Sequence, residues 1–216
     1  MKNILKNIYL IIKRVFDFVF AAILLIILLI PFAIIAILIK TEDRGPVFYT
    51  QDRVGKKLKN FKIYKFRSMK TGRKELESNL THDEMVTNVG KFIRKTSIDE
   101  LPQLINILKG EMSFIGPRPW IPEYYVWFTE EQKRRSDVLP GITGLAQVKG
   151  RNRINIFKKI DYDIEYVDNM SIVMDIKIVF LTIKQLFEKD EAEIAESGIK
   201  AEIEELRANK EKSSNV

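Results

Sequence analysis

The chain has 216 residues, 46% of them hydrophobic and 30% charged, which is enough for one domain with a core and an appended element. It contains no cysteine, which excludes a disulfide framework and a cysteine-ligated zinc site. The formal net charge is +7, but residues 188–216 carry 9 acidic and 5 basic side chains, so residues 1–187 hold the positive excess. Such an excess predicts anionic partners, namely nucleic acid, an anionic membrane face or phosphorylated substrates.

An uninterrupted apolar run, Phe18–Ile39, contains 22 residues without a charged or hydrogen-bonding side chain. At about 1.5 Å of rise per residue, a helix of this length crosses a hydrocarbon core of about 30 Å, whereas a signal peptide has a shorter apolar part. Basic residues flank the run, which favours both ends on the cytoplasmic side and therefore a membrane hairpin. Pro31 would bend the helix for such a re-entrant turn, but a kinked spanning helix fits the composition equally well.

A turn at Asp43–Pro46 separates the apolar run from the globular part. Strands are predicted next at residues 47–51 and 61–67, joined by a turn, and they are expected to pair as a hairpin. A helix is expected around residues 74–80. His82 lies in the same polar stretch, where an exposed loop position is expected.

Two adjacent carboxylates, Asp99 and Glu100, stand at the predicted start of a helix that ends at Gly110. Ser97 can cap this helix, with Glu100 completing a capping box, or Asp99 can be the cap. A helix start favours carboxylates and binds phosphate, because its backbone N–H groups are unpaired and its dipole is positive there. Caps of this kind are common, so these residues alone leave open whether the pair performs chemistry or only caps.

Two arginines follow glycines in predicted loops. Arg118 lies between two prolines after Gly116, on a stiff loop that loses little entropy on ordering and suits a bidentate grip on phosphate. An exposed turn is the alternative interpretation. Arg151 directly follows Gly150.

Three later stretches also have structural interpretations. Aromatic residues recur at helical spacing between residues 120 and 128, either as core packing or as a belt at a membrane interface. The apolar residues 173–187 predict a helix that either lies in a membrane surface, with Lys177 and Lys184 reaching water, or packs in the core. Residues 188–216 have too few apolar positions for a core-facing stripe, so we expect a solvated helical tail.

The chain lacks a phosphate-binding P-loop, a serine-hydrolase elbow and a paired-histidine zinc motif. A membrane anchor, a basic face, glycine-flanked arginines and an acidic pair instead favour phosphate chemistry at a membrane surface. Carboxylates bind Mg²⁺ while the ion keeps waters and substrate phosphate oxygens, and the ion and arginines would neutralise charge during phosphoryl transfer. A carboxylate can also attack phosphorus itself, and the spacing does not decide between these roles.

Seven segments carry motifs that occur together in one known family. They are residues 13–17, Gly45–Phe48, Gln51–Gly55, Phe61–Met69, Ser97–Gln103, Lys109–Pro119 and Pro140–Asn152. From about residue 12 to about residue 187, in unbroken order, the chain resembles the small monotopic phosphoglycosyl transferases, which are bacterial sugar transferases.

The resemblance implies an enzyme that transfers a sugar 1-phosphate from a UDP-sugar to undecaprenyl phosphate, giving a polyprenol-diphosphate sugar and UMP in the first membrane step of glycoconjugate assembly. It implies that Asp99 is the nucleophile and forms a covalent phosphosugar intermediate, that Glu100 assists it, and that both hold Mg²⁺. The basic residues implied to bind substrate phosphate or nucleotide are Lys65, Arg94, Arg118 and Arg151.

The fold implied by the resemblance is α+β and mainly helical, with a re-entrant helix-break-helix, a small strand hairpin and interfacial amphipathic helices. This favours the membrane hairpin, although the family usually breaks the helix at Ser-Pro, where the hydroxyl can bond back to a carbonyl, and this chain has Ile30-Pro31. The expected organisation is a membrane element at 1–43, a cytoplasmic catalytic domain at 44–187 and a charged helical tail at 188–216.

The expected location is the bacterial inner membrane, with the catalytic domain on the cytoplasmic face. Membrane lipid is an expected partner and nucleic acid is not. The alternative function is a membrane-anchored basic adaptor that binds anionic lipid or nucleic acid without catalysis, and it predicts salt-sensitive binding without turnover.

Overall fold

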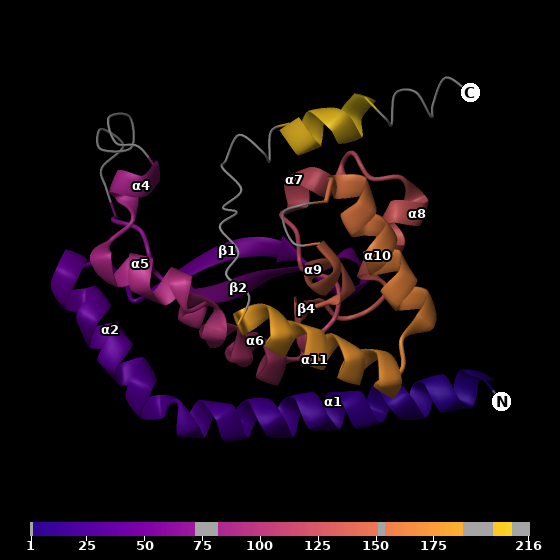
Figure 1. Ribbon diagram of the computed structural model, residues 1–216, viewed down its shortest axis with the longest axis horizontal. Helices are drawn as coiled ribbons and strands as arrows, with labels where there is room; N and C mark the ends of the chain where they lie inside the picture. Colours follow the sequence, from indigo (N-terminus) through magenta and orange to yellow (C-terminus); the bar gives the residue numbers. More distant parts are fainter. Residues whose placement is uncertain (1, 72–81, 151–153, 188–200, 209–216) are drawn as a thin grey trace. The chain divides into compact units, whose positions relative to one another are not determined.

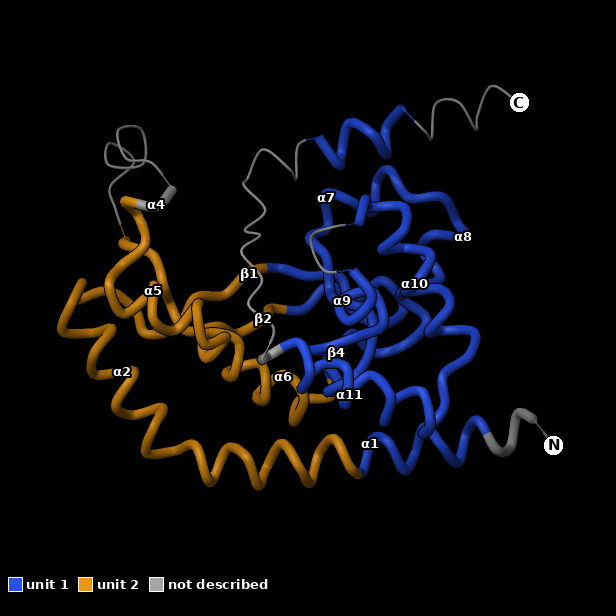
Figure 2. The backbone as a smooth tube through the Cα atoms, viewed as in Figure 1, with its two compact units in different colours: residues 1–15, 52–61, 111–216 blue, residues 16–51, 62–110 orange. Residues whose placement is uncertain are grey.

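The computed structural model describes residues 2–71, 82–150, 154–187 and 201–208. The chain forms two compact units, shown in different colours in Figure 2. Unit 1 comprises residues 1–15, 52–61 and 111–216, and unit 2 comprises residues 16–51 and 62–110. Each unit is therefore assembled from segments that are distant in the sequence. The helix expected at residues 74–80 lies outside the described residues.

The chain is mainly helical with short strands, as predicted (Figure 1). The α-helices are α1 (Lys2–Ile27), α2 (Leu29–Asp43), α4 (His82–Met85), α5 (Asn88–Lys95), α6 (Leu104–Lys109), α7 (Pro122–Tyr125), α8 (Glu130–Lys133), α9 (Leu145–Gly150), α10 (Ile156–Asn169) and α11 (Ile172–Phe187). The 3₁₀ helices are η1 (Lys56–Leu58), η2 (Ile98–Gln103) and η3 (Arg134–Ser136). The strands β1 (Phe48–Val54) and β2 (Asn60–Phe66) form one sheet, and β3 (Ser113–Ile115) and β4 (Gly141–Thr143) form another.

The apolar run forms two helices, α1 and α2, which meet at Leu28 and are bent by 62°. Pro31 explains this bend, because its ring removes the backbone hydrogen bond to residue 27 and clashes with that carbonyl group. The helical pattern resumes where the Phe32 N–H group donates to Leu28 O at 2.8 Å. The predicted break therefore forms without a serine before the proline. In the described part of the chain, no single helix has the length and composition of a membrane span, whereas this bent pair does when taken together.

The predicted hairpin forms from β1 and β2, but β1 continues to Val54 instead of ending at residue 51. Pairing with β2 extends the strand through two charged residues that carried only a turn signal in the sequence. The chain reverses direction over Gly55 and η1, where the Gly55 N–H group donates to Lys59 O at 2.9 Å.

The core of unit 2 surrounds Phe66, which ends β2 and is 1% exposed. The rings of Phe32 and Phe48 lie with their centroids 5.0 and 5.5 Å from the Phe66 ring. Ile39 from α2 and Ile93 from α5 belong to the same buried cluster. The apolar end of α2 therefore packs on the globular part of its own unit.

Unit 1 contains a parallel pair of three-residue strands, β3 and β4, which the sequence analysis did not predict. Ser113 pairs with Gly141, and Ile115 pairs with Thr143. The strands approach so closely that a Cβ atom on Gly141 would overlap the backbone nitrogen of Gly116. Such short strands carry no alternating pattern that a sequence could show, so this pair forms through tertiary contacts.

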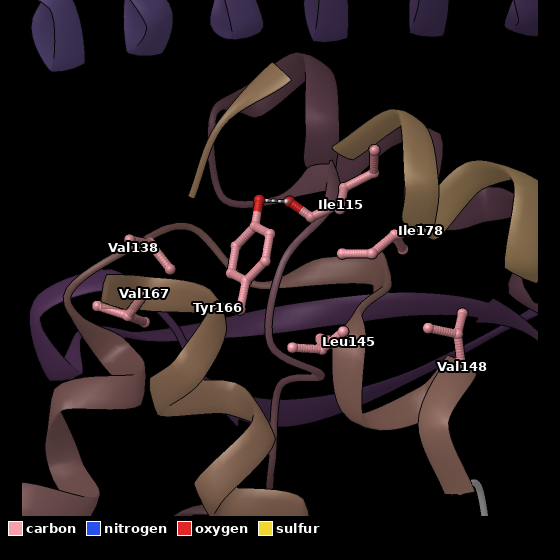
Figure 3. Packing of buried hydrophobic residues seen from close by; sticks show 7 residues of the cluster. All are labelled: Ile115, Val138, Leu145, Val148, Tyr166, Val167 and Ile178. Carbon is pink, nitrogen blue, oxygen red and sulfur yellow. Dashed lines mark hydrogen bonds between the residues drawn. The ribbon is translucent and has the colours of Figure 1, made fainter. Parts of the chain in front are cut away.

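The main core of unit 1 contains Tyr166 from α10, which is 1% exposed and surrounded by the apolar side chains in Figure 3. Its hydroxyl group lies 2.8 Å from Asp175 Oδ1 and 3.3 Å from the carbonyl oxygen of Ile115. Asp175 Oδ2 also accepts hydrogen bonds from the Tyr9 hydroxyl at 2.8 Å and the Lys13 ammonium group at 2.7 Å. This carboxylate therefore fixes the start of α1 to α10 and α11.

The aromatic residues between 120 and 128 form a second core cluster, which favours core packing over a membrane belt. Tyr124 and Phe128 are buried, and the Trp120 ring centroid lies 5.1 and 5.5 Å from theirs.

The tail contributes to this second cluster. Residues 201–208 are helical, and Leu206 is 1% exposed within the cluster. Glu202 accepts hydrogen bonds from the Tyr124 hydroxyl at 2.9 Å and from Lys159 at 2.8 Å. The predicted helix forms over residues 201–208 and most of its residues are exposed, but Leu206 and Glu202 pack on the aromatic cluster, which supplies a surface for them.

Helix α11 has both buried and exposed apolar residues. Ile178 is fully buried in the core of unit 1, whereas Val173 and Phe180 are 77% and 69% exposed. The core interpretation is thus correct for one side of the helix, and the other side presents an apolar surface.

Candidate active site

Unit 2 brings two of the predicted site residues into direct contact. Lys65 on β2 places its ammonium group 2.7 Å from Glu100 Oε1, and the two side chains are 20% and 19% exposed. Asp99, the predicted nucleophile, precedes Glu100 on η2 and is partly exposed. A lysine and two adjacent carboxylates, all partly exposed, therefore lie together at one place in unit 2.

The turn that carries the acidic pair differs from the predicted helix start. Ser97 has a left-handed backbone conformation, with φ 56° and ψ 17°, and its side chain makes no capping hydrogen bond. The predicted capping box is therefore wrong, and Glu100 pairs with Lys65 instead. A left-handed conformation costs a residue other than glycine about 1–2 kcal/mol and persists where the surrounding structure imposes it. The carboxylates are thus positioned by a tight turn and an ion pair.

Helix α6 fixes the strand that carries Lys65. Asn106 is fully buried; its Oδ1 atom accepts from the Tyr64 N–H group at 3.0 Å, and its amide nitrogen donates to Lys62 O at 2.8 Å. These bonds hold the backbone of β2 beside α6 and so set the position of Lys65 relative to Glu100. Asn106 was not among the predicted site residues, although a single polar residue inside an apolar helical stretch was a signal for such a role.

Arg94, near the end of α5, lies in the same unit. Its Nε atom donates to the Ser68 hydroxyl at 2.9 Å. Helix α5 can approach this segment because Gly90 has no side chain, since a Cβ atom there would overlap the Ser68 carbonyl oxygen. Thr87 caps the helix by accepting from the Gly90 N–H group at 2.8 Å. Ser68 thus orients Arg94, a role that was not predicted from the sequence.

The Arg118 loop belongs to unit 1. Arg118 is exposed, whereas the flanking Pro117 and Pro119 are buried. The loop leaves β3, and the Gly141 N–H group donates to Pro117 O at 3.0 Å, which ties the loop to β4. The predicted stiff loop is therefore tied to β4 at Pro117, directly before an exposed arginine.

Arg151 lies outside the described residues. It follows α9, which ends at Gly150.

The acidic pair fits a magnesium ion by its chemistry. Among the residues that the structure describes, no group of three or more His, Cys, Asp or Glu side chains is placed to hold a metal. Magnesium commonly takes one or two carboxylates and completes its shell with waters and substrate phosphate oxygens. Asp99 and Glu100 match this donor set.

Comparison with known proteins identifies the family. Residues 8–189 match the family described as bacterial sugar transferase. The chain belongs to this family. The predicted resemblance is therefore confirmed at the level of the family.

Three relatives illustrate the similarity. An uncharacterized sugar transferase of Bacillus subtilis (strain 168), EpsL, is 46% identical over 181 residues, which cover 82% of this chain and 87% of the relative. A UDP-glucose:undecaprenyl-phosphate glucose-1-phosphate transferase of Escherichia coli (strain K12) is 41% identical, covering 79% of this chain and 39% of the relative. An undecaprenyl-phosphate galactose phosphotransferase of Salmonella typhimurium is 39% identical, covering 88% and 43%. The chain thus spans most of the first relative and less than half of the other two.

Proposed function

We propose that the chain transfers a sugar 1-phosphate from a UDP-sugar to undecaprenyl phosphate and releases UMP. The family match over residues 8–189 carries this proposal. The names of the Escherichia coli and Salmonella relatives supply the acceptor, undecaprenyl phosphate, and they differ in the sugar. The contact between Lys65 and Glu100, beside Asp99, supports a site for phosphate chemistry in this chain.

The proposed reaction has two displacements at one phosphorus atom. The Asp99 carboxylate attacks the phosphorus that bears the sugar, a bond forms between its oxygen and phosphorus, and the bond to UMP breaks, so that UMP leaves with the electron pair. A phosphate oxygen of undecaprenyl phosphate then attacks the same phosphorus and displaces Asp99. Covalent catalysis of this kind divides one difficult transfer into two easier steps.

The neighbouring residues have distinct roles in this proposal. Lys65 holds Glu100 in a fixed position, and Arg94 adds a cationic group that Ser68 orients. Glu100 assists Asp99 as its partner. Asp99 and Glu100 would hold Mg²⁺, and the ion would neutralise negative charge on the donor phosphates.

Arg118 and Arg151 are proposed to bind the phosphate or nucleotide of the donor. The exposure of Arg118 between two buried prolines supports this role, since the loop loses little further entropy when it binds an anion.

A membrane location is also part of the proposal. The bent α1–α2 pair would enter and leave the membrane on the cytoplasmic face of the inner membrane, with the exposed apolar side of α11 in the interface. Many apolar residues of α1 and α2 are exposed, including Ile26 at 75% and Ile30 at 71%. Apolar surface of this extent is stable when lipid covers it.

The decisive experiment measures UMP release by the full-length chain, with Mg²⁺ and undecaprenyl phosphate, across a panel of UDP-sugars. Asp99→Asn is expected to lower the rate by about 10³-fold or more, as loss of a nucleophile does. Asp161→Asn is the matched control, because Asp161 is exposed on α10. Without the acceptor, a phosphosugar adduct is expected on the peptide that contains Asp99. Full activity of Asp99→Asn would refute the assigned nucleophile, and salt-sensitive anion binding without UMP release would favour the adaptor function.

The membrane hairpin is tested separately by reporters fused to each end of the chain. Both are expected on the cytoplasmic side. A periplasmic N-terminus would contradict the hairpin and indicate a spanning helix.

A further inference from the structure

A buried ion pair lies directly behind the Arg118 loop in unit 1. Arg135 on η3 donates to Asp163 Oδ2 on α10 from Nε at 2.9 Å and from Nη2 at 2.6 Å, and the two side chains are 1% and 3% exposed. Burial acts to raise the pKa of the Asp163 carboxyl group, and the charge and hydrogen bonds of Arg135 oppose this. A buried pair of this kind is weak support for stability, because its desolvation cost offsets much of the attraction.

The remaining donors of Arg135 are directed at the Arg118 loop and its surroundings. Nη2 donates to the backbone carbonyl oxygen of Arg118 at 2.6 Å, and Nη1 donates to the Tyr125 hydroxyl at 2.7 Å. The guanidinium group also lies over the Trp120 ring, 4.3 Å from its centroid. The guanidinium group of Arg135 therefore contacts the loop at Arg118 and at Trp120, and it also contacts Tyr125 at the end of α7.

This arrangement places Arg118 between two kinds of restraint. The prolines on either side limit the backbone dihedral angles, and Arg135 fixes the carbonyl group of Arg118 itself. Arg135 and Arg118 also line the same small surface depression. The side chain of Arg118 stays exposed while its backbone is held from inside the protein.

We propose that Arg135, held by Asp163, is a positioning residue that fixes the Arg118 backbone so that the Arg118 side chain meets the phosphate of the sugar donor. The proposal rests on the proposed function, because it gives Arg135 a part in binding the same sugar donor. A lysine cannot replace Arg135, since a single ammonium group does not present donors in the separate directions of Asp163, Tyr125 and Arg118.

The test is a double-mutant cycle on kcat/KM for UMP release. Arg135→Lys keeps the positive charge opposite Asp163 and is expected to lower kcat/KM by about 10- to 100-fold, as misplacement of a substrate-binding group does. In an Arg118→Ala background the same substitution is expected to have an effect of less than about twofold, because the residue that it positions is absent. Equal effects in both backgrounds would overturn the proposal and leave Arg135 with a purely structural role.

Arg134→Lys provides the matched control. Arg134 is the neighbouring residue on η3, and its guanidinium group pairs with Glu131 and Asp168 near the surface. It is expected to leave kcat/KM unchanged in both backgrounds. Tyr125→Phe is the second variant if Arg135→Lys does not fold; it removes one partner of Arg135 and is expected to lower kcat/KM by about threefold, again only when Arg118 is present.

A readout independent of activity separates this proposal from the proposed function. Hydrogen exchange at the Arg118 and Trp120 amides is expected to be about tenfold faster in Arg135→Lys than in the wild type, and unchanged in Arg134→Lys. If the wild-type chain released no UMP, the proposed function would fail, and unchanged exchange in Arg135→Lys would refute the positioning of the loop by itself.

Discussion

Replacing Asn106 with alanine removes the side chain that joins α6 to β2. Asn106 is fully buried and makes two hydrogen bonds to the backbone of β2, one to the Tyr64 N–H group and one to Lys62 O. No water or side chain is expected to replace both bonds at a position that is already packed. The substitution therefore loses both bonds and leaves two backbone groups without their partner.

The expected cost follows from these contacts. Two hydrogen bonds contribute a net of about 1 kcal/mol each, and an unsatisfied buried polar group costs about 1–3 kcal/mol. We expect Asn106→Ala to lower the free energy of unfolding by about 3 kcal/mol. In the proposed enzyme it also lowers kcat/KM, because β2 carries Lys65 to Glu100.

The assay is urea unfolding of the full chain in mild detergent, compared with Asn169→Ala. Asn169 makes a single exposed hydrogen bond from its side-chain amide, to Glu165 O at 2.9 Å, so its loss is expected to change the free energy of unfolding by less than about 0.5 kcal/mol. An effect of Asn106→Ala as small as that of Asn169→Ala would refute the assignment of Asn106 as the residue that fixes β2.

Substitutions at three other positions test separate features of the fold. Gly141→Ala is expected to lower the free energy of unfolding by about 3 kcal/mol in the same assay, because the added Cβ overlaps the Gly116 backbone; an unchanged midpoint would contradict the close approach of β3 and β4. Ser97→Gly is expected to raise the free energy of unfolding by about 0.5 kcal/mol, since relief of the left-handed strain slightly exceeds the entropic cost of glycine. Ser97→Val is expected to lower it by about 1 kcal/mol or more. If glycine destabilised the chain and valine stabilised it, strain at this turn would be excluded. Burial, together with the charge of Asp175, raises the pKa of Tyr166 in the folded state above its usual value of 10.0. The unfolded state therefore loses this proton at a lower pH than the folded state, and the free energy of unfolding falls as the pH rises above 10. Tyr166→Phe is expected to reduce this slope in unfolding measurements between about pH 8 and pH 11, and an unchanged slope would assign it to other groups.

The sequence predicted features whose cause is local. Pro31 breaks the apolar run because a proline removes a hydrogen bond within its own helix, and Gly110 ends α6 because its backbone is left-handed, with φ 82°. The hairpin of β1 and β2 followed from alternating residues, and the family followed from motifs in unbroken order. The acidic pair was a candidate because two adjacent carboxylates stand at the predicted start of a helix.

Other features depend on segments that are distant in the sequence. Ser97 gave no sign of its left-handed backbone, because that conformation is imposed by the surrounding structure. The partner of Glu100 is Lys65, 35 positions away, and Arg135 reaches the Arg118 carbonyl across 17 positions. Leu206 is buried because the aromatic cluster supplies the surface that its own segment lacks. Residue types and local dihedral angles determined where the chain bends and which side chains are candidates for chemistry. Only tertiary packing decided which charged groups meet, because opposite charges far apart in the sequence carry no periodic signal.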